Sequence, residues 1–419
     1  MTETVQQMLT KLYLIDSKPW LVGFSGGKDS TMVLSLVIKT ILMNSGHNSL
    51  KPVYVLCTDT GVEFPPVAEL VEKTLIKVQE YSQEQNLNLT VHLLRPSAEH
   101  SFWVNIIGRG YPPPNRNFRW CTQRLKIDPV SRFVENNIGR WGEAILLLGA
   151  RKSESSSRAQ TLAGIEKKSG LRHHPDLPRV WIANPIEDLS TEDVWNYLNS
   201  EDNPWGGSNG ALRDLYASAN CDEAPFQIDN STPSAGNSRF GCWTCTVIER
   251  DKAAEGLIES GFIKMVPLLS LRKKLVEYRD PNNGMRDMRR MNGAEGPGPL
   301  TMFARRDLLE ELLSAQKQTG YKLISEEELF KIQELWRSAR NPDDGTGVGR
   351  IMHEVRGTAM NEPNKMADLS HIQELVCKEK DVDVDTLRRM IGKVEEYIDS
   401  HRAHGLPDDL LNILKDDMQ

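Results

Sequence analysis

The sequence predicts an α/β protein with a doubly wound, mainly parallel five-stranded sheet and a helical C-terminal region. Short, continuously apolar runs alternate with helix-like stretches over the first 200 residues. Strands that are apolar along their whole length are typical of parallel sheets covered on both faces. After residue 251 the pattern becomes mostly helical. In such a fold the ligand site is expected at the carboxyl ends of the strands.

Five apolar runs are the expected strands, and helical patterns lie between them. The strands are expected at Leu21–Phe24, Val53–Cys57, Thr90–Leu94, Ile145–Leu148 and Val180–Ala183. The clearest helical patterns are Ser30–Met43 and Pro66–Tyr81. Ser190 and Asp193 have the spacing of a capping box, which predicts that a further helix begins there.

The second half of the chain divides by composition. Residues 206–241 are rich in Gly, Ser, Asn, Asp and Pro, which predicts a long loop or lid. Amphipathic helices are expected over 307–316 and 325–340, a surface loop over 341–349, and short helices in the tail. The expected domains are 1–200 for the α/β part, 201–250 for a cysteine-containing loop or lid, 251–355 for a helical region and 356–419 for a small helical tail.

Composition and charge are those of an ordinary soluble protein. Of 419 residues, 39% are hydrophobic and 26% are charged, and no apolar run approaches the roughly 18 residues of a membrane span. No signal peptide is apparent, so a cytoplasmic location without a membrane partner is expected. The net charge of −7 argues against non-specific coating of nucleic acid. Basic residues concentrate at Met285–Arg290, Arg305 and Arg306, which we interpret as a solvated charged face.

The run Ser25–Ser30, Ser-Gly-Gly-Lys-Asp-Ser, follows the first expected strand directly. Its two glycines allow the backbone to approach an anion closely, and amides at the start of a helix attract negative charge. Its two serine hydroxyls and the ammonium group of Lys28 add further donors. The pattern therefore predicts a phosphate-binding loop. The alternative is a plain turn whose helix is capped by Asp29 or Ser30.

This loop differs from a Walker loop, which has four residues between its first glycine and Gly-Lys. It resembles the PP-loop of the ATP pyrophosphatases, which holds the departing pyrophosphate. The resemblance implies an adenine nucleotide alpha hydrolase-like fold for residues 1–200 and cleavage of ATP between its α- and β-phosphates, with Mg²⁺ on the phosphate oxygens. The implied catalytic residues are Ser25, Lys28, Asp29 and Arg151. The implied ATP-binding residues are Ser25, Gly26, Gly27, Lys28, Asp29, Ser30, Asp59, Arg151 and Arg158.

Two further stretches carry this resemblance. Residues 54–65 are similar to the strand and turn that lie beside the nucleotide in PAPS-reductase-like proteins, where Asp59 could order a metal or a ribose hydroxyl. Residues 148–155, with Arg158, are similar to the second phosphate-contacting motif, and guanidinium groups grip phosphate oxygens in pairs. The alternatives are a turn that starts a helix for Asp59 and a surface loop with solvated arginines for the second stretch.

Six cysteines are too few for a disulfide framework, so metal or redox chemistry is the more useful hypothesis. Cys242 and Cys245 are spaced so that both can reach one metal centre, and Cys121 and Cys221 could complete a set of four. The spacing leaves four interpretations open: a zinc site, a [4Fe–4S] cluster, a redox dithiol at Cys242 and Cys245, and unrelated buried cysteines.

The stretch from Cys121 to Pro129, with Arg124 and Lys126, resembles that of cluster-bearing PAPS-reductase relatives, although Trp120 stands where these often have a second cysteine. Together with residues 240–246 and 298–305, it makes residues 12–340 resemble the DndC-type sulfurtransferases of bacterial DNA phosphorothioation, a group that includes the SspD proteins. The resemblance implies a [4Fe–4S] cluster held by Cys121, Cys221, Cys242 and Cys245.

The resemblance also implies a reaction. ATP would activate a DNA phosphodiester as an adenylate, and persulfide sulfur from a cysteine desulfurase would replace a non-bridging oxygen. The acidic chain would meet DNA within a complex with other phosphorothioation proteins, as part of restriction–modification or antiphage defence. The alternatives are a PAPS or APS reductase-like oxidoreductase, which usually has a reactive C-terminal cysteine, a tRNA thiolation enzyme, and a non-catalytic subunit that binds ATP.

Overall fold

The structure is a computed structural model, and it describes residues 2–45, 51–154, 170–219, 240–337 and 347–357. These residues belong to one compact unit, Met1–Met360. The expected division into four domains stays a prediction. Among the described helices, none is both long enough and apolar enough to cross a membrane.

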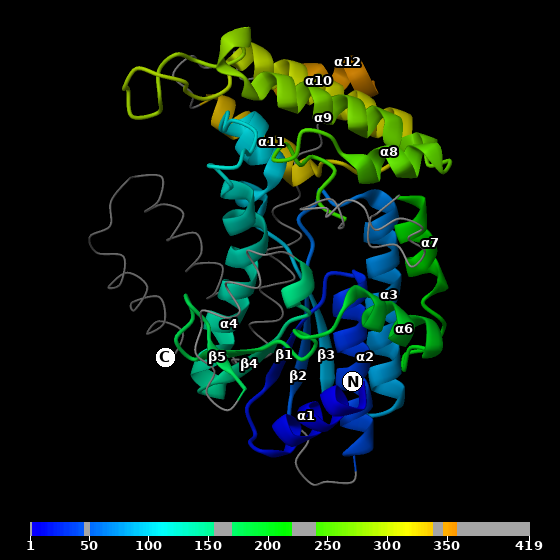
Figure 1. Ribbon diagram of the computed structural model, residues 1–419. Coiled ribbons are helices and arrows are strands. Elements are labelled where there is room, and N and C mark those ends of the chain that lie inside the picture. Colours follow the sequence, from blue (N-terminus) through cyan, green and yellow to red (C-terminus); the bar gives the residue numbers. More distant parts are fainter. Residues whose placement is uncertain (1, 46–50, 155–169, 220–239, 338–346, 358–419) are drawn as a thin grey trace, which may run out of the picture. The chain divides into compact units, whose positions relative to one another are not determined.

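One six-stranded sheet forms the centre of the unit, in the order β3-β2-β1-β4-β6-β5 (Figure 1). The strands are β1 Trp20–Gly23, β2 Val53–Thr58, β3 Leu89–Leu94, β4 Ala144–Leu147, β5 Arg172–His173 and β6 Val180–Ala183. All neighbouring pairs are parallel except β5 and β6. The predicted mainly parallel sheet is confirmed, but the number of five strands was wrong. The strand that was not predicted is β5, which has two residues, too few to produce a pattern in the sequence.

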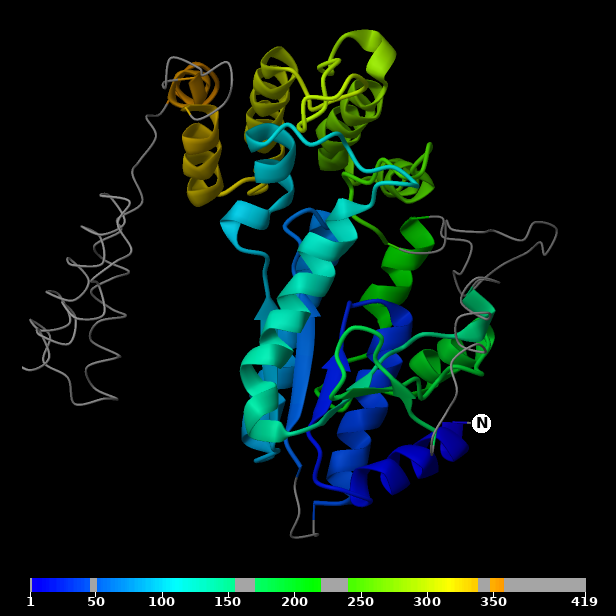
Figure 2. The same ribbon diagram turned by 90° about the vertical axis from the view of Figure 1, so that its left-hand side faces the viewer.

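Helices cover both faces of the sheet, as a doubly wound fold requires. On one face, Leu21 of β1 and Leu146 of β4 pack against Val134 of helix α4. On the other face, Val22 and the next strand's Val55 join the larger core, to which the other five helices of this half contribute (Figure 2). The helices of this half are α1 Thr2–Leu14, α2 Lys28–Met43, α3 Pro65–Glu84, α4 Asp128–Trp141, α6 Thr191–Ser200 and α7 Gly210–Ser218.

The C-terminal part of the unit is helical, as predicted. Its helices are α8 Lys252–Glu259, α9 Val266–Arg279, α10 Met302–Thr319, α11 Glu326–Arg337 and α12 Gly347–Arg356. Helices α10 and α11 both pack on η2, the π-helical turn Val104–Gly108 that follows β3. This contact joins the helical part to the α/β part.

Arg305 makes the same junction and corrects one prediction. Its side chain is buried, and its guanidinium donates to the carbonyl oxygens of Ile107, at 2.6 Å, and Gly108. It also lies 5.7 Å from the ring of Trp336. Burial lowers the pKa of Arg305 to about 10. The interpretation of Arg305 as part of a solvated face was therefore wrong, because the carbonyl oxygens of this turn accept from its guanidinium inside the molecule.

The segment predicted as a long loop contains helix α7. Leu212, Leu215 and Tyr216 of this helix are buried on one side, at spacings typical of an amphipathic helix. The glycines and polar residues around it concealed this short pattern. The part of the predicted lid at 220–239, most of the predicted loop at 341–349 and the tail helices lie outside the described residues, although helix α12 already begins at Gly347.

Candidate nucleotide site and cysteine segment

The loop between β1 and α2 is held by its own hydrogen bonds. The hydroxyls of Ser30 and Thr31 both donate to the carbonyl oxygen of Gly27 at 2.9 Å, and the amide of Ser25 donates to the Ser30 hydroxyl at 3.2 Å. Gly27 is the N-cap residue of α2, and no side chain caps this helix. The alternative of a plain turn capped by Asp29 or Ser30 was therefore wrong. The start of α2 faces the end of a parallel strand without a capping side chain, as anion-binding loops do.

Gly26 brings this loop close to helix α3. Its φ of +73° lies in the left-handed region that glycine adopts readily. A Cβ atom at this position would lie 2.1 Å from Cγ2 of Val71. Both constraints require glycine here, and they bring the loop backbone against α3; its approach to an anion stays a prediction.

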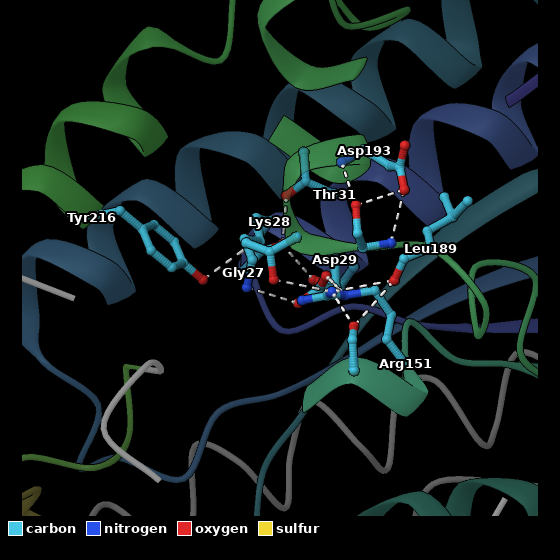
Figure 3. Close-up of polar contacts among 12 residues, drawn as sticks. Gly27, Lys28, Asp29, Thr31, Arg151, Leu189, Asp193 and Tyr216 are labelled. Carbon is cyan, nitrogen blue, oxygen red and sulfur yellow. Dashed lines mark hydrogen bonds and ion pairs between the residues drawn. The ribbon is translucent and has the colours of Figure 1, made fainter. Parts of the chain in front are cut away.

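Asp29 is the centre of an ion-pair group (Figure 3). One carboxylate oxygen accepts from Nε of Arg151 at 2.6 Å, and the other lies 3.2 Å from Nζ of Lys28. Arg151 also donates to the hydroxyls of Ser153 and Thr191. The structure thus brings the predicted residues Lys28, Asp29 and Arg151 together, across 122 residues of sequence in the case of Asp29 and Arg151.

Lys28 and Arg151 point away from solvent in this arrangement. Their side chains are 1% and 0% exposed, respectively. Asp29 borders the adjoining cavity, together with Ser25 and Ser30, whereas the two cations lie behind it. The direct contacts of Lys28 and Arg151 are with the protein. Their predicted role at the phosphates stays a prediction.

A cavity of about 620 Å³ opens at the carboxyl ends of β1, β2 and β4. The phosphate loop forms one wall, and Gly149 of the predicted second motif adjoins it so closely that a Cβ there would lie 2.9 Å from the carbonyl carbon of Asp29. Its volume is within the range of small-molecule sites, which is about 300–1,000 Å³. The cavity lies where ligands bind in open α/β sheets.

Asp59 forms part of the wall that follows β2. Its carboxylate accepts from Nε of Arg95 at 2.8 Å and from the amide of Gly61 at 2.9 Å. The second bond is typical of an Asx turn. Asp59 therefore acts as a turn residue, which was the alternative to a nucleotide-binding role, and it also borders the cavity. Arg158, the other predicted nucleotide residue of a loop, lies outside the described residues.

Tyr216 and Glu63 border the same cavity and were not predicted. The amide of Lys28 donates to the Tyr216 hydroxyl at 3.4 Å, and the Tyr216 ring packs edge-on against Phe240. The carboxylate of Glu63 accepts from the hydroxyl and amide of Thr60. Burial raises the pKa of Glu63. The signal that could have found Tyr216 is its helical spacing from Leu212 and Leu215, which the surrounding glycines and polar residues concealed.

The cysteine segment is joined to the cavity wall. Cys242 forms an isolated antiparallel bridge with Glu63, and the amide of Trp243 donates to the carbonyl oxygen of Val62 at 3.0 Å. Phe240 and Gly241, directly before Cys242, border the cavity. The segment that carries Cys242 and Cys245 therefore continues the turn that follows β2.

Lys126 carries a positive charge that interacts with the cysteines, and it also borders the cavity. Its pKa is raised, first by the charge of Cys242 and also by those of Cys121 and Cys245. Burial raises the pKa of the Cys242 thiol to about 12 and that of Cys121 above its usual value. Burial thus disfavours the thiolate forms, and Lys126 partly offsets this effect at Cys242.

The three described candidate ligands do not form a complete metal site. Among the described residues, no three Cys, His, Asp or Glu side chains come together as a metal-binding group. Cys221, the fourth predicted ligand, lies outside these residues. Cys57 is buried in β2, and burial first of all raises the pKa of its thiol to about 12, as expected of an inert core residue.

Comparison with known families identifies a match over this half of the chain. A family model described as the phosphoadenosine phosphosulfate reductase domain matches residues 19–248. An uncharacterized protein of Methanocaldococcus jannaschii is 28% identical over 232 residues, which are 55% of this chain and 37% of that protein. A phosphoadenosine 5′-phosphosulfate reductase of Xanthomonas oryzae pv. oryzae is 26% identical over 152 residues, 36% of this chain and 53% of the reductase. The chain thus spans between about a third and a half of these relatives.

Solved structures with similar folds include two with different activities. A phosphoadenylyl-sulfate reductase of Candida auris, in a phosphate complex, has 16% identity and a TM-score of 0.33, over 51% of this chain and 85% of that one. The U34-tRNA thiolase NcsA of Methanococcus maripaludis, with its [4Fe–4S] cluster, has 11% identity and a TM-score of 0.31, over 66% and 79%. Both superpositions are weak.

Proposed function

We propose that this chain, which belongs to the phosphoadenosine phosphosulfate reductase domain family, is an ATP-cleaving enzyme that activates the DNA backbone for phosphorothioate modification. The observation that carries the proposal is the loop Ser25–Ser30, which borders a cavity of about 620 Å³ at the carboxyl ends of the strands. The segment with Cys242 and Cys245 adjoins the same cavity. A phosphate loop beside cysteines suits the activation of an oxygen that sulfur then replaces.

In the first step, a non-bridging oxygen of a DNA phosphodiester attacks the α-phosphorus of ATP, and pyrophosphate leaves. Loop amides and the hydroxyl of Ser25 donate to the pyrophosphate oxygens as negative charge develops there, while the Ser30 hydroxyl keeps its bond to the carbonyl oxygen of Gly27. Asp29, held by Lys28 and Arg151, keeps the start of α2 in place. We propose that Mg²⁺ arrives with ATP, bound mainly by phosphate oxygens, as is usual for this ion.

In the second step, the terminal sulfur of a protein persulfide attacks the activated DNA phosphorus, and AMP leaves with the original oxygen. A second cysteine thiol then attacks the inner sulfur of the persulfide, which releases the DNA phosphorothioate and leaves a disulfide. An external thiol reductant restores the two thiols. A cysteine desulfurase supplies the persulfide sulfur. The similarity to the DndC-type group supports DNA as the acceptor, and other phosphorothioation proteins as partners.

We propose further that Cys121, Cys221, Cys242 and Cys245 hold a [4Fe–4S] cluster. A cluster bound there would supply a site for carrying sulfur or a rigid link between the segments. The described cysteines do not by themselves make this site, so no step is assigned to it. Anaerobic purification tests the proposal: a brown protein with about four iron atoms per chain supports it. A colourless protein with one zinc per chain would show that the site is a zinc site.

Release of pyrophosphate from ATP tests the first step. Ser25→Ala removes one exposed hydroxyl from the loop and should lower the rate of release about tenfold or more, because donors to a developing charge typically contribute at least this much. Ser131→Ala removes a hydroxyl from the opposite part of the cavity wall and is the matched control. Chelation of Mg²⁺ should abolish release in both. Equal rates for the two variants would contradict the role of the loop.

The acceptor is tested by offering the enzyme alternatives. The chain is incubated with ATP, Mg²⁺, cysteine, a cysteine desulfurase and either DNA or tRNA, and digested products are analysed by mass spectrometry. Phosphorothioate dinucleotides from DNA support the proposal, and thiolated bases from tRNA would replace it with tRNA thiolation. A third reaction contains PAPS and a dithiol. Release of sulfite in this reaction would favour PAPS reductase activity, the activity given in the name of the Xanthomonas relative.

A further inference from the structure

Residues 109–127 form a basic stretch in an acidic protein. They include five basic residues and no Asp or Glu, in a chain of net charge −7. Two of the arginines have partners: Arg109 pairs with Glu99, and Arg124 donates to Asn105 and Tyr111. Arg116 and Arg119 are exposed and make no ion pair with any described residue. Two exposed, uncompensated cations therefore precede Cys121 directly.

Phe118 stands between these two arginines and is 44% exposed. Its position is set by a tight turn, because the side-chain oxygen of Asn115 accepts from the amides of Asn117 and Phe118, both at 2.9 Å. The turn is anchored by the Thr246 hydroxyl, which donates to the carbonyl oxygen of Pro114 at 2.5 Å. The aromatic ring is thus presented to solvent by an ordered loop. The ring lies 6.5 Å from that of Tyr111 and is flanked in sequence by two exposed arginines, the combination of aromatic ring and cations on which a base can stack.

A second basic element begins beside this loop. Residues 285–300 form a hairpin-like excursion, with antiparallel bridges between Arg286 and Leu300 and between Arg289 and Glu295. Its base is joined to the basic stretch by the amide of Leu300, which donates to the carbonyl oxygen of Gly110 at 2.6 Å. In Figure 1 it is the yellow-green loop that projects beyond α10. Arg289 and Arg290 are exposed on it, and neither has an ion pair among the described residues.

We propose that these two elements form a docking surface for an unpaired nucleic-acid strand. Phosphates would contact Arg116, Arg119 and the two hairpin arginines, and one base would stack on Phe118. Base stacking on an aromatic ring next to arginines is the usual mode of single-strand binding. A duplex hides its base faces, so Phe118 selects a strand that is at least locally open. The inference deepens the proposed function and rests on it for the identity of the acceptor.

The position of the surface fits this role. Arg119 is separated from Cys121 only by Trp120, whose buried ring stacks on Phe102 at 5.6 Å. A strand bound at Phe118 would therefore contact the segment that continues through Cys121 to Lys126 and Ile127, which border the cavity. An acidic protein partner would use the same cations, and the polyglutamate experiment below separates the two occupants.

Fluorescence anisotropy with the full chain tests the surface. The probes are a fluorescein-labelled 20-nucleotide DNA strand of mixed sequence and its duplex, each over a salt series without ATP. The variants are R116Q/R119Q, F118A and R289Q/R290Q. The matched control is R140Q/R179Q, which removes two exposed arginines at the amino-terminal ends of β4 and β6. Urea unfolding and pyrophosphate release are measured for every variant to verify that the fold and the nucleotide site are intact.

The strand should bind more tightly than the duplex. R116Q/R119Q should weaken strand binding and reduce the slope of log affinity against log salt by about 1.4, since each phosphate contact to a single strand contributes about 0.7. R289Q/R290Q should act in the same direction. F118A should weaken binding at least about fivefold with little change in slope, because stacking is not an ionic interaction. The control should bind like the unmodified chain.

Three results would overturn the inference: equal losses in the control, no effect of F118A, or equal affinity for the duplex. If polyglutamate binds with the same affinity as the DNA strand, and F118A leaves that affinity unchanged, the surface would be assigned to an acidic protein instead. The outcome is separate from that of the proposed function. If the expected binding pattern is found but no phosphorothioate forms, the docking surface is supported and the proposed reaction is contradicted. If phosphorothioate forms but binding is unaffected in all variants, the reaction is supported and the docking surface is contradicted.

Discussion

Gly26 carries the strictest requirement of any residue in the phosphate loop. Its backbone is left-handed, and Val71 of α3 occupies the space where a side chain would begin. Gly26→Ala should therefore combine a conformational penalty of about 1–2 kcal/mol with an overpacking penalty of about 1–3 kcal/mol. We expect a lower free energy of unfolding in urea and slower pyrophosphate release, because the loop would move away from α3.

Gly61→Ala is the matched control for this prediction. Gly61 has nearly the same φ, +74°, but nothing lies within 4 Å of its hypothetical Cβ atom. This variant should incur the conformational penalty alone. Equal destabilisation in the two variants would mean that the contact with Val71 relaxes without cost and that Gly26 is required only for its backbone conformation.

At the scale of single residues, the sequence indicates the type of chemistry better than the direction of each side chain. The resemblance implied Lys28, Asp29 and Arg151 as catalytic residues, and their side chains meet in the structure, although their catalytic role stays a prediction. It did not predict that both cations would turn toward Asp29 and away from the cavity. The direction of Arg151 is fixed by its bond to Ser153 in the same loop and by its bond to Thr191, which lies 40 residues further along the chain.

Among the elements, helix α6 begins with a capping box that the sequence predicted. The Ser190 hydroxyl accepts from the amide of Asp193 at 3.0 Å, and the Asp193 carboxylate accepts from the Ser190 amide at 2.9 Å. Ser190→Ala should lower the free energy of unfolding by about 1 kcal/mol at pH 7. Ser200→Ala, at the other end of α6, removes only a bond to the carbonyl oxygen of Tyr197 and should cost less.

This difference should depend on pH. The hydrogen bonds from Ser190 hold the pKa of Asp193 below its usual value. A carboxyl whose pKa is lower in the folded state stabilises the fold above its unfolded pKa, about 4, and loses this effect as the pH falls through the folded value. The gap in unfolding free energy between the unmodified chain and Ser190→Ala should therefore shrink below about pH 4. A gap that stays constant from pH 7 to pH 3 would contradict the account.

A helix or strand can be predicted from the sequence when the pattern of its own buried residues is clear within that segment. The five parallel strands begin and end within one residue of the predicted positions, because four of them are mainly apolar runs and β3 alternates apolar with polar residues. Strand β5 is defined only by its pairing with β6. Helix α7 is short, and its buried residues stand in a glycine-rich context. Pairing and packing between distant segments decide these two elements.

At the scale of the whole unit, the cavity connects the nucleotide loop to the cysteines through one continuous wall. The carboxyl end of β2 leads into the turn with Asp59 and Glu63, and this turn pairs with the segment that carries Cys242. Tyr216 adds a second connection, because its hydroxyl lies at the amide of Lys28 and its ring packs on Phe240. Occupation of the cavity should therefore order both regions together.

Hydrogen exchange measured by mass spectrometry tests this coupling. Binding of an ATP analogue that resists α–β cleavage should slow exchange in residues 23–31, and also in 60–64 and 240–246, where the Trp243 amide donates to Val62. Ligand binding stabilises those regions whose local opening it opposes. Helix α12 does not border the cavity, so its exchange should stay unchanged. Protection confined to 23–31 would mean that the cysteine segment moves independently of the nucleotide, and that activation and sulfur transfer are not coupled through this wall.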